Sequence, residues 1–190
     1  MKVGLDIDGT LTKTFELFIK ELRELGFLLS DTPEHKGTSY SDYTLGCIPS
    51  EYYRRWYAEN FLRLRRLYAI QPGVQDALQN SPHTFVAVTN RCTINGSCPS
   101  TLSWIQEHSL PISQVFFTQN KVAVCKQQCI DIFVEDTVHN ALALAKEGIP
   151  VLLINAYYNQ NVSHPFIKRF FSWQEIPSLI EHFNRRKSFS

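Results

Sequence analysis

Short apolar runs at wide intervals constrain the fold of this chain more than any other feature of its sequence. Most of the runs are continuously apolar, a pattern typical of strands buried on both faces of a parallel sheet. They cover Lys2–Ile7, Thr84–Thr89, Gln114–Phe117, Ile130–Val134 and Pro150–Ile154. Helical patterns such as Thr101–His108 and His139–Glu147 lie between them. This alternation predicts an α/β sandwich with right-handed crossovers.

One interval breaks the alternation. No convincing strand occurs between Ile7 and Thr84, but Phe15–Leu25 and Ser50–Leu67 carry apolar residues at helical spacing. The stripe of the first segment comprises Leu17, Phe18, Leu22 and Leu25. The sequence therefore predicts a helical insertion directly after the first strand.

Composition limits the classes of partner. The 190 residues are 44% hydrophobic and 19% charged, which favours one compact unit over disorder or a coiled coil. Lys and Arg total 19 and Asp and Glu total 18, giving a net charge of +1. This balance removes the electrostatic argument for duplex nucleic acid or an anionic membrane. The arginines of segment 54–66 could form a nucleic-acid surface, but a solvated helix face is the favoured interpretation.

The cysteines and the N-terminal region suggest a reducing compartment. No apolar run approaches the ~20 residues of a spanning helix, and Asp6 and Asp8 interrupt any signal-peptide core. We therefore expect a cytoplasmic protein with no disulfide and no zinc among its five cysteines, although a crystallisation disulfide between Cys92 and Cys98 stays open. The cysteines are Cys47, Cys92, Cys98, Cys125 and Cys129.

Polar residues follow several of the predicted strands at the point where each strand ends. The carboxyl ends of parallel strands form the ligand-binding edge of an open α/β sheet, so these side chains are expected to converge. The candidates are Asp6, Asp8, Gly9 and Thr10 after the first strand, Thr89, Asn90 and Arg91 after the second, Lys121 at a helix start, and Glu135 and Asp136 after the fourth strand.

The chemistry of this edge favours a metal ion and a phosphate. Asp6 and Asp8 point to one side of the strand tip, where their repulsion would raise both pKa values unless a cation lies between them. Oxygen ligands with substrate phosphate suit Mg²⁺. Gly9 permits a sharp turn whose N–H groups could face an anion, and Thr89 and Lys121 could bind phosphate oxygens.

Together these residues resemble a known family. Asp6-x-Asp8-Gly9-Thr10, Thr89, Lys121 and Glu135-Asp136 are similar to the four motifs of the haloacid dehalogenase (HAD) superfamily, over residues 2–154. The resemblance implies a Rossmann-like three-layer sandwich, with a catalytic core of residues 1–12 and 72–190 and a helical type-1 cap of residues 13–71. Ile130–Asp136 and Asn155–Gln160 further resemble bacterial nucleotidases of the 5′(3′)-deoxyribonucleotidase family.

The resemblance also implies an activity and roles for residues. It implies a Mg²⁺-dependent phosphomonoesterase that removes phosphate from (deoxy)nucleoside monophosphates through an aspartyl-phosphate. Asp6 would be the nucleophile and Asp8 the general acid and base. Asp6, the backbone carbonyl of Asp8, and Asp136 would bind Mg²⁺. Thr89, Asn90 and Lys121 would hold the phosphoryl oxygens.

Several alternatives stay open at this point. Glu135 competes with Asp136 as a metal ligand, Lys126 competes with Lys121, and Arg91 is a further candidate for phosphate. The position four residues after Asp136, where many family members carry a second acid, is Asn140. Other functions are a phosphatase for another small metabolite and a non-catalytic nucleotide-binding module. A homodimer is also open.

Aromatic residues of the insertion are the candidates for selecting the substrate, because the core grips only the phosphate. We expect Trp56 and Tyr57 to form the core of the cap, since a stripe at helical spacing is usually packing. Phe15, Tyr40 and Tyr43 lie off that stripe and are expected to face the cleft, where Phe15 and Tyr43 would select the base.

Overall fold

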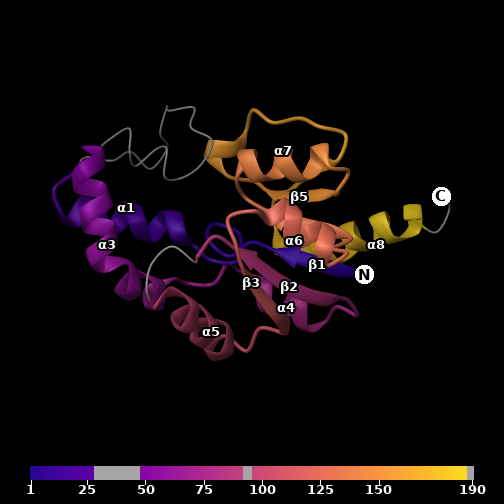
Figure 1. The fold of residues 1–190 in the computed structure, drawn as a ribbon, viewed down its shortest axis with the longest axis horizontal. Helices are drawn as coiled ribbons and strands as arrows, with labels where there is room; N and C mark the ends of the chain where they lie inside the picture. The colour runs from indigo at the N-terminus through magenta and orange to yellow at the C-terminus, as the bar shows by residue number, and fades with distance from the viewer. Residues whose placement is uncertain (28–47, 92–95, 188–190) are drawn as a thin grey trace.

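A six-stranded parallel sheet forms the centre of the molecule (Figure 1). The computed structural model describes residues 1–27, 48–91 and 96–187. The strand order is β3-β2-β1-β4-β5-β6. The chain therefore adds β2 and β3 on one side of β1 and then crosses over to add β4, β5 and β6 on the other side. The strands are β1 (Lys2–Leu5), β2 (Thr84–Thr89), β3 (Ile112–Phe117), β4 (Ile132–Glu135), β5 (Val151–Ile154) and β6 (Ile167–Phe170).

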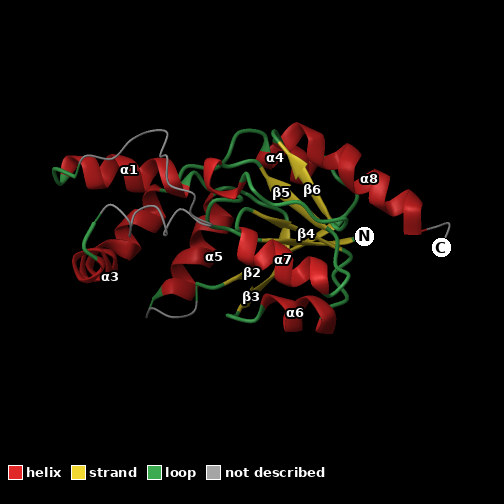
Figure 2. Cartoon of the chain, turned by 90° about the horizontal axis from the view of Figure 1, so that it is seen from above, coloured by secondary structure: helices red, strands yellow, loops and turns green. Residues whose placement is uncertain are grey.

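Helices cover both faces of the sheet, which gives the three layers (Figure 2). Alternate residues of β2 explain this arrangement, because Phe85 and Ala87 pack into one core cluster while Val86 and Val88 pack into the other. The first cluster includes residues of α4, α5 and α8, and the second includes residues of α6 and α7. The helices are α4 (Val74–Gln79), α5 (Ser97–Glu107), α6 (Lys121–Gln127), α7 (Val138–Lys146) and α8 (Ile176–Lys187). The α/β fold class predicted from the sequence is confirmed.

The strand junction between β1 and β4 depends on a glycine. Gly4 pairs with Phe133, and a Cβ at Gly4 would lie 2.4 Å from the Phe133 ring. Only a residue without a side chain lets this ring lie across β1. The two strands that carry the acidic residues are thereby held in direct contact.

Two helices of the insertion lie side by side beyond one end of the sheet (Figures 1 and 2). They are α1 (Thr14–Glu24) and α3 (Ser50–Leu67), and they share a separate core that includes Phe18, Leu22 and Trp56, with Tyr57 packed against it. Leu25, expected on the buried stripe of the first helix, is 47% exposed because it lies beyond the end of α1.

The two connections between the insertion and the sheet are paired. Thr12 and Ile70 form an antiparallel bridge, the Lys13 N–H donates to the Ala69 carbonyl at 2.8 Å, and the Gln71 N–H donates to the Leu11 carbonyl at 2.8 Å. This pairing falls at the boundary that the sequence predicts for the cap. The division into a cap and a core stays a prediction.

Some strand positions differ from those expected. β1 ends at Leu5, β3 begins earlier, at Ile112, and β6 was not expected. β6 escaped prediction because Lys168 and Arg169 interrupt its apolar residues, as an edge strand permits.

Two further observations concern the surface and the thiols. Within the described residues, no helix has the length and apolar character needed to cross a membrane. Cys98, Cys125 and Cys129 are free thiols, and Cys47 and Cys92 lie outside the described residues.

Candidate active site

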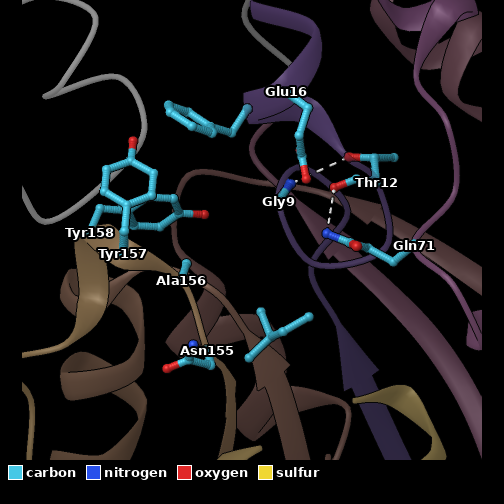
Figure 3. A pocket seen from close by; sticks show the side chains of 10 residues that line it. Gly9, Thr12, Glu16, Gln71, Asn155, Ala156, Tyr157 and Tyr158 are labelled. Carbon is cyan, nitrogen blue, oxygen red and sulfur yellow. Dashed lines mark hydrogen bonds between the residues drawn. The ribbon is translucent and has the colours of Figure 1, made fainter. Parts of the chain in front are cut away.

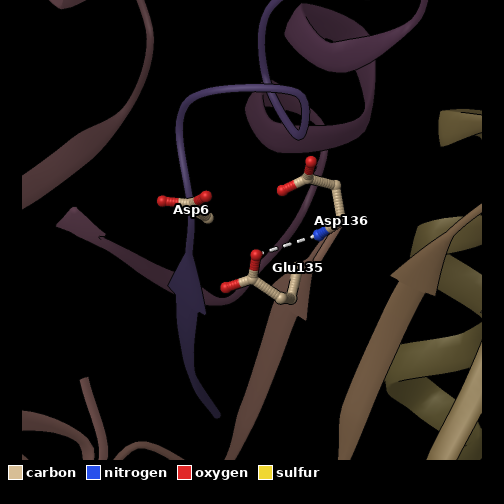
Figure 4. A group of neighbouring side chains, drawn as sticks. All are labelled: Asp6, Glu135 and Asp136. Atoms are coloured by element: carbon tan, nitrogen blue, oxygen red, sulfur yellow. Dashed lines mark hydrogen bonds between the residues drawn. The ribbon is translucent and has the colours of Figure 1, made fainter. Parts of the chain in front are cut away.

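Three buried carboxylates meet where β1 and β4 end (Figure 4). Asp6 follows β1 directly, Glu135 is the last residue of β4, and Asp136 comes next. One ligand atom from each lies within 4.8 Å of the others. The reversal of strand order between β1 and β4 is the position where open α/β sheets bind ligands.

Lys121 lies between two of these carboxylates. It is the first residue of α6, and its Nζ lies 2.8 Å from Oδ1 of Asp6 and 2.7 Å from Oε2 of Glu135. Burial opposes its charge, but the two carboxylates raise the pKa of Lys121 above its ordinary value. Lys126, the competing candidate, instead forms a surface ion pair with Glu147.

Both carboxylate oxygens of Glu135 are occupied by protein donors. Oε2 accepts from Lys121, and Oε1 accepts from the backbone N–H of Asp136 and from the N–H and hydroxyl of Thr137, at 3.0–3.1 Å. Burial would raise the pKa of Glu135, but Lys121 holds it below its ordinary value. Glu135 is therefore an ionised anchor for Lys121 and for the start of α7.

Asp136 and Asp6 are compensated less fully, because Asp136 accepts from the uncharged hydroxyls of Tyr158 and Thr10 and Asp6 shares Lys121 with Glu135. Burial, followed by the charges of Glu135 and Asp6, raises the pKa of Asp136 well above its ordinary value. Burial raises the pKa of Asp6 to about 7, against the opposing effect of Lys121. Three carboxylates share one ammonium group, so the site has the excess negative charge and the oxygen donors that fit a hard divalent cation.

Asp8 is held away from this cluster by an arginine. The Arg91 guanidinium donates to both carboxylate oxygens of Asp8, at 2.8 and 2.6 Å. Arg91 also donates to Thr101 at 3.3 Å and is 2% exposed. Burial would raise the pKa of Asp8, but Arg91 lowers it below its ordinary value. Arg91, considered from the sequence as a phosphate contact, is thus engaged with Asp8.

The remaining predicted phosphate contacts lie at the end of β2. Thr89 is its last residue and is 1% exposed, and Asn90 follows it at the surface. The N–H of Gly9 itself donates within the turn, to the hydroxyls of Thr12 and Thr14 at 3.3 Å. That other N–H groups of this turn face an anion stays a prediction.

A cavity of about 140 Å³ is lined in part by Gly9 and Tyr158, two residues that lie next to the Asp136 carboxylate (Figure 3). Thr12, Glu16 and Gln71 lie on one side of it and residues 155–158 on the other. Phe15 lines the cavity, with its ring centroid 4.6 Å from that of Tyr157. Tyr40 and Tyr43, the other expected substrate contacts, lie outside the described residues.

Three residues to which the sequence assigned no role lie next to the site, and two of them belong to the stretch Asn155–Gln160 that carries part of the family resemblance. Tyr158 and Asn159 hydrogen-bond to Asp136, and Arg65 of α3 is 4% exposed, although a solvated helix face was expected there. Tyr158 and Asn159 follow β5, so their position after a strand end was the signal that could have found them. Arg65 had no such signal, because its burial depends on contact between α3 and α5.

Comparison with known proteins identifies the relatives of this chain. No family model matches it. A protein of Clostridium acetobutylicum named as a nucleotidase is 30% identical over 188 residues, which cover 95% of this chain and 94% of that protein. A HAD-superfamily hydrolase of Geobacter sulfurreducens is similar in structure, with a TM-score of 0.61, 20% identity, and coverage of 94% of this chain and 95% of that one.

A haloacid dehalogenase-like protein of unknown function from Agrobacterium tumefaciens has a TM-score of 0.71 at 14% identity, covering 96% of this chain and 98% of that one. The fold is thus that of solved HAD-superfamily structures, and the acidic residues lie at its strand ends. The chain belongs to the family of the Clostridium protein, which is 30% identical along almost its whole length.

Proposed function

We propose that the protein is a Mg²⁺-dependent phosphomonoesterase that removes phosphate from nucleoside monophosphates, including deoxynucleotides. The observation that carries the proposal is the placement of Asp6 and Asp136 on neighbouring strand ends, with Lys121 against Asp6. The name of the Clostridium relative supports the nucleotide as the substrate class.

In this proposal, the cation is held by Asp6, Asp136 and the backbone carbonyl of Asp8. Glu135 is less suited as a direct ligand because its oxygens already accept from Lys121, Asp136 and Thr137. When bound, Mg²⁺ supplies positive charge that offsets the charge of the phosphate and of the carboxylates.

Asp6 is proposed as the nucleophile. Its carboxylate attacks phosphorus and forms the acyl phosphate as the bond to the leaving oxygen breaks. Lys121, which already lies 2.8 Å from Asp6, is placed to neutralise a phosphoryl oxygen on the same group, with Thr89 and Asn90 as further phosphate contacts. Such covalent catalysis divides one difficult displacement into two easier steps.

Asp8 is proposed as the proton donor and acceptor. In the first step Asp8 acts in its protonated form and gives its proton to the leaving oxygen. In the second step water attacks phosphorus, the bond from phosphorus to Asp6 breaks and releases phosphate, and Asp8 accepts the proton of the water. Arg91 lowers the pKa of Asp8, which favours the ionised form that the second step requires and opposes the protonated form that the first step requires.

Phe15 is proposed to contact the leaving group, with Tyr43 as a second candidate. Phe15 lines the cavity beside Asp136 and packs against Tyr157, so an aromatic wall is available to a base. A nucleic-acid surface on α3 is disfavoured because Arg55 pairs with Glu59, Arg63 pairs with Glu21, and Arg65 is buried.

The test is phosphate release from a panel of substrates with and without Mg²⁺. The panel contains ribo- and deoxyribonucleoside 5′- and 3′-monophosphates, sugar phosphates and 4-nitrophenyl phosphate. We expect the highest kcat/KM for a nucleotide, loss of activity on chelation, and recovery with Mg²⁺. A preference for a sugar phosphate would replace the substrate class, and activity that survives chelation would overturn the metal assignment.

A further inference from the structure

The segment that follows β5 contacts Asp136 through a tyrosine hydroxyl. Tyr158 donates to Oδ2 of Asp136 at 2.6 Å, and the ring is 5% exposed. The other carboxylate oxygen, Oδ1, accepts from the Thr10 hydroxyl at 3.3 Å. The shortest hydrogen bond to the Asp136 carboxylate therefore comes from the segment after β5, and not from the loop after β1 that follows the proposed nucleophile Asp6.

Asn159 fixes the main chain of the same residue. Its Nδ2 donates to the carbonyl oxygens of Asp136 at 2.7 Å and of Ile154 at 2.8 Å, and the side chain is fully buried. Tyr158 and Asn159 thus hold Asp136 at two separate points, the side chain and the backbone.

Arg169 of β6 donates two hydrogen bonds to Asn159. Its Nη1 donates to Oδ1 of Asn159 and its Nη2 donates to the Asn159 carbonyl, both at 2.6 Å. A continuous set of hydrogen bonds therefore runs from β6, through the segment after β5, to the acidic residue after β4.

The space around the Asp136 carboxylate leaves little room for rotation. A Cβ at Gly9 would lie 2.3 Å from Oδ2 of Asp136 and 3.0 Å from the Tyr158 hydroxyl, so the Gly9 backbone lies close to the same carboxylate oxygen that the tyrosine contacts. A carboxylate enclosed in this way keeps one orientation, and fixed orientation of a ligand carboxylate strengthens cation binding.

We propose that Tyr158 and Asn159 are positioning residues that hold Asp136 in the orientation that binds the divalent cation, with Arg169 as their outer support. This inference rests on the proposed metal site. It assigns to the segment after β5 a role in metal affinity rather than in the chemical steps.

The test measures cation binding directly. Isothermal titration with Mg²⁺ should show Tyr158→Phe weakening binding by roughly 10- to 100-fold, the usual effect of losing an outer partner of a metal ligand. Tyr157→Phe is the matched control, because it removes the neighbouring hydroxyl from a ring that packs on Phe15, and its Kd should stay within about threefold of the parent protein. Activity of Tyr158→Phe should return toward the parent kcat at saturating Mg²⁺, which a general loss of structure would not allow.

A second variant keeps the inference testable if Tyr158→Phe does not fold. Arg169→Gln removes the outer support from a partly exposed position, and we expect a smaller loss of Mg²⁺ affinity of about threefold to tenfold. Unchanged Mg²⁺ affinity in a folded Tyr158→Phe protein, or in Arg169→Gln if the first variant unfolds, overturns the inference. Absence of Mg²⁺ binding in the parent protein would instead overturn the metal site, and this inference with it.

Discussion

The guanidinium of Arg91 holds the carboxylate of Asp8 through paired hydrogen bonds, from Nε to Oδ2 at 2.8 Å and from Nη2 to Oδ1 at 2.6 Å. This pair gives Asp8 a different electrostatic environment from that of the three clustered carboxylates. Asp6 and Glu135 share one lysine and Asp136 lies beside them, so these carboxylates suit a further cation, whereas Asp8 has Arg91 as its own counter-charge. Two aspartates that stand two residues apart in the sequence thus occupy different electrostatic environments.

The paired hydrogen bonds from Arg91 to Asp8 should affect the rate of hydrolysis most when the leaving group needs a proton. Arg91→Lys keeps the charge but loses the paired geometry, so Asp8 loses its fixed orientation. General acid catalysis contributes ~10²–10⁴-fold, and we expect a loss of about tenfold or more in kcat/KM for a nucleotide. Hydrolysis of 4-nitrophenyl phosphate, whose leaving group needs no proton, should fall much less. Equal losses on both substrates would show that Arg91 does not act through Asp8.

Stabilisation by Mg²⁺ should increase with pH. The pKa of Asp6 is raised to about 7 from 3.8, so its contribution to stability is present below pH ~4 and is lost as the pH rises through 7. Asp136 has a shift of the same sign. Because bound Mg²⁺ replaces protons at these carboxylates, the increase in Tm on adding Mg²⁺ should be small at pH 5 and larger at pH 8.

Thermal unfolding at both pH values, with and without Mg²⁺, measures this effect. Asp6→Asn is the control, since it removes one of the titrating carboxylates and should flatten the pH dependence. An equal gain in Tm at the two pH values would contradict the proposed linkage.

Gly9→Ala tests the close packing around Asp136. The new Cβ would meet Oδ2 of Asp136 at 2.3 Å, and the residue has a φ of +78°, which favours glycine. We expect loss of Mg²⁺ affinity together with lower stability. Gly26→Ala is the matched control, because its φ is +88° but its Cβ would meet nothing within 4 Å. It should lose about 1–2 kcal/mol of stability and keep its affinity for Mg²⁺. Similar affinities in the two variants would remove the steric explanation.

Phe15→Ala tests selection of the leaving group. Loss of stacking on a base costs ~1–3 kcal/mol, so kcat/KM for a nucleotide should fall by about tenfold to a hundredfold, with little change for 4-nitrophenyl phosphate. Tyr52→Ala is a suitable control, because Tyr52 is an exposed aromatic of α3 that packs against Phe27. If Phe15→Ala changes both substrates equally, Phe15 does not contact the base.

The sequence predicted the sheet and its acidic edge because both depend on local patterns. Continuous apolar runs identified the buried strands, their ends located Asp6 and Asp136 at one edge of the sheet, and the start of the helix before the fourth strand located Lys121 there. Contacts between distant segments left no such pattern. The pairing of Arg91 with Asp8 joins residues that are 83 positions apart in the sequence, and the burial of Arg65 depends on how α3 meets α5.

The most direct test of the central claim is detection of the phosphoryl group on Asp6. The parent protein is mixed with a nucleotide and Mg²⁺, quenched with acid during turnover, digested, and analysed by mass spectrometry. We predict a phosphorylated peptide that contains Asp6 in the parent protein and none in Asp6→Asn, which should fold normally and lose at least ~10⁴-fold in turnover. A folded Asp6→Asn protein with full activity, or a phosphoryl group carried by another residue, would contradict the account.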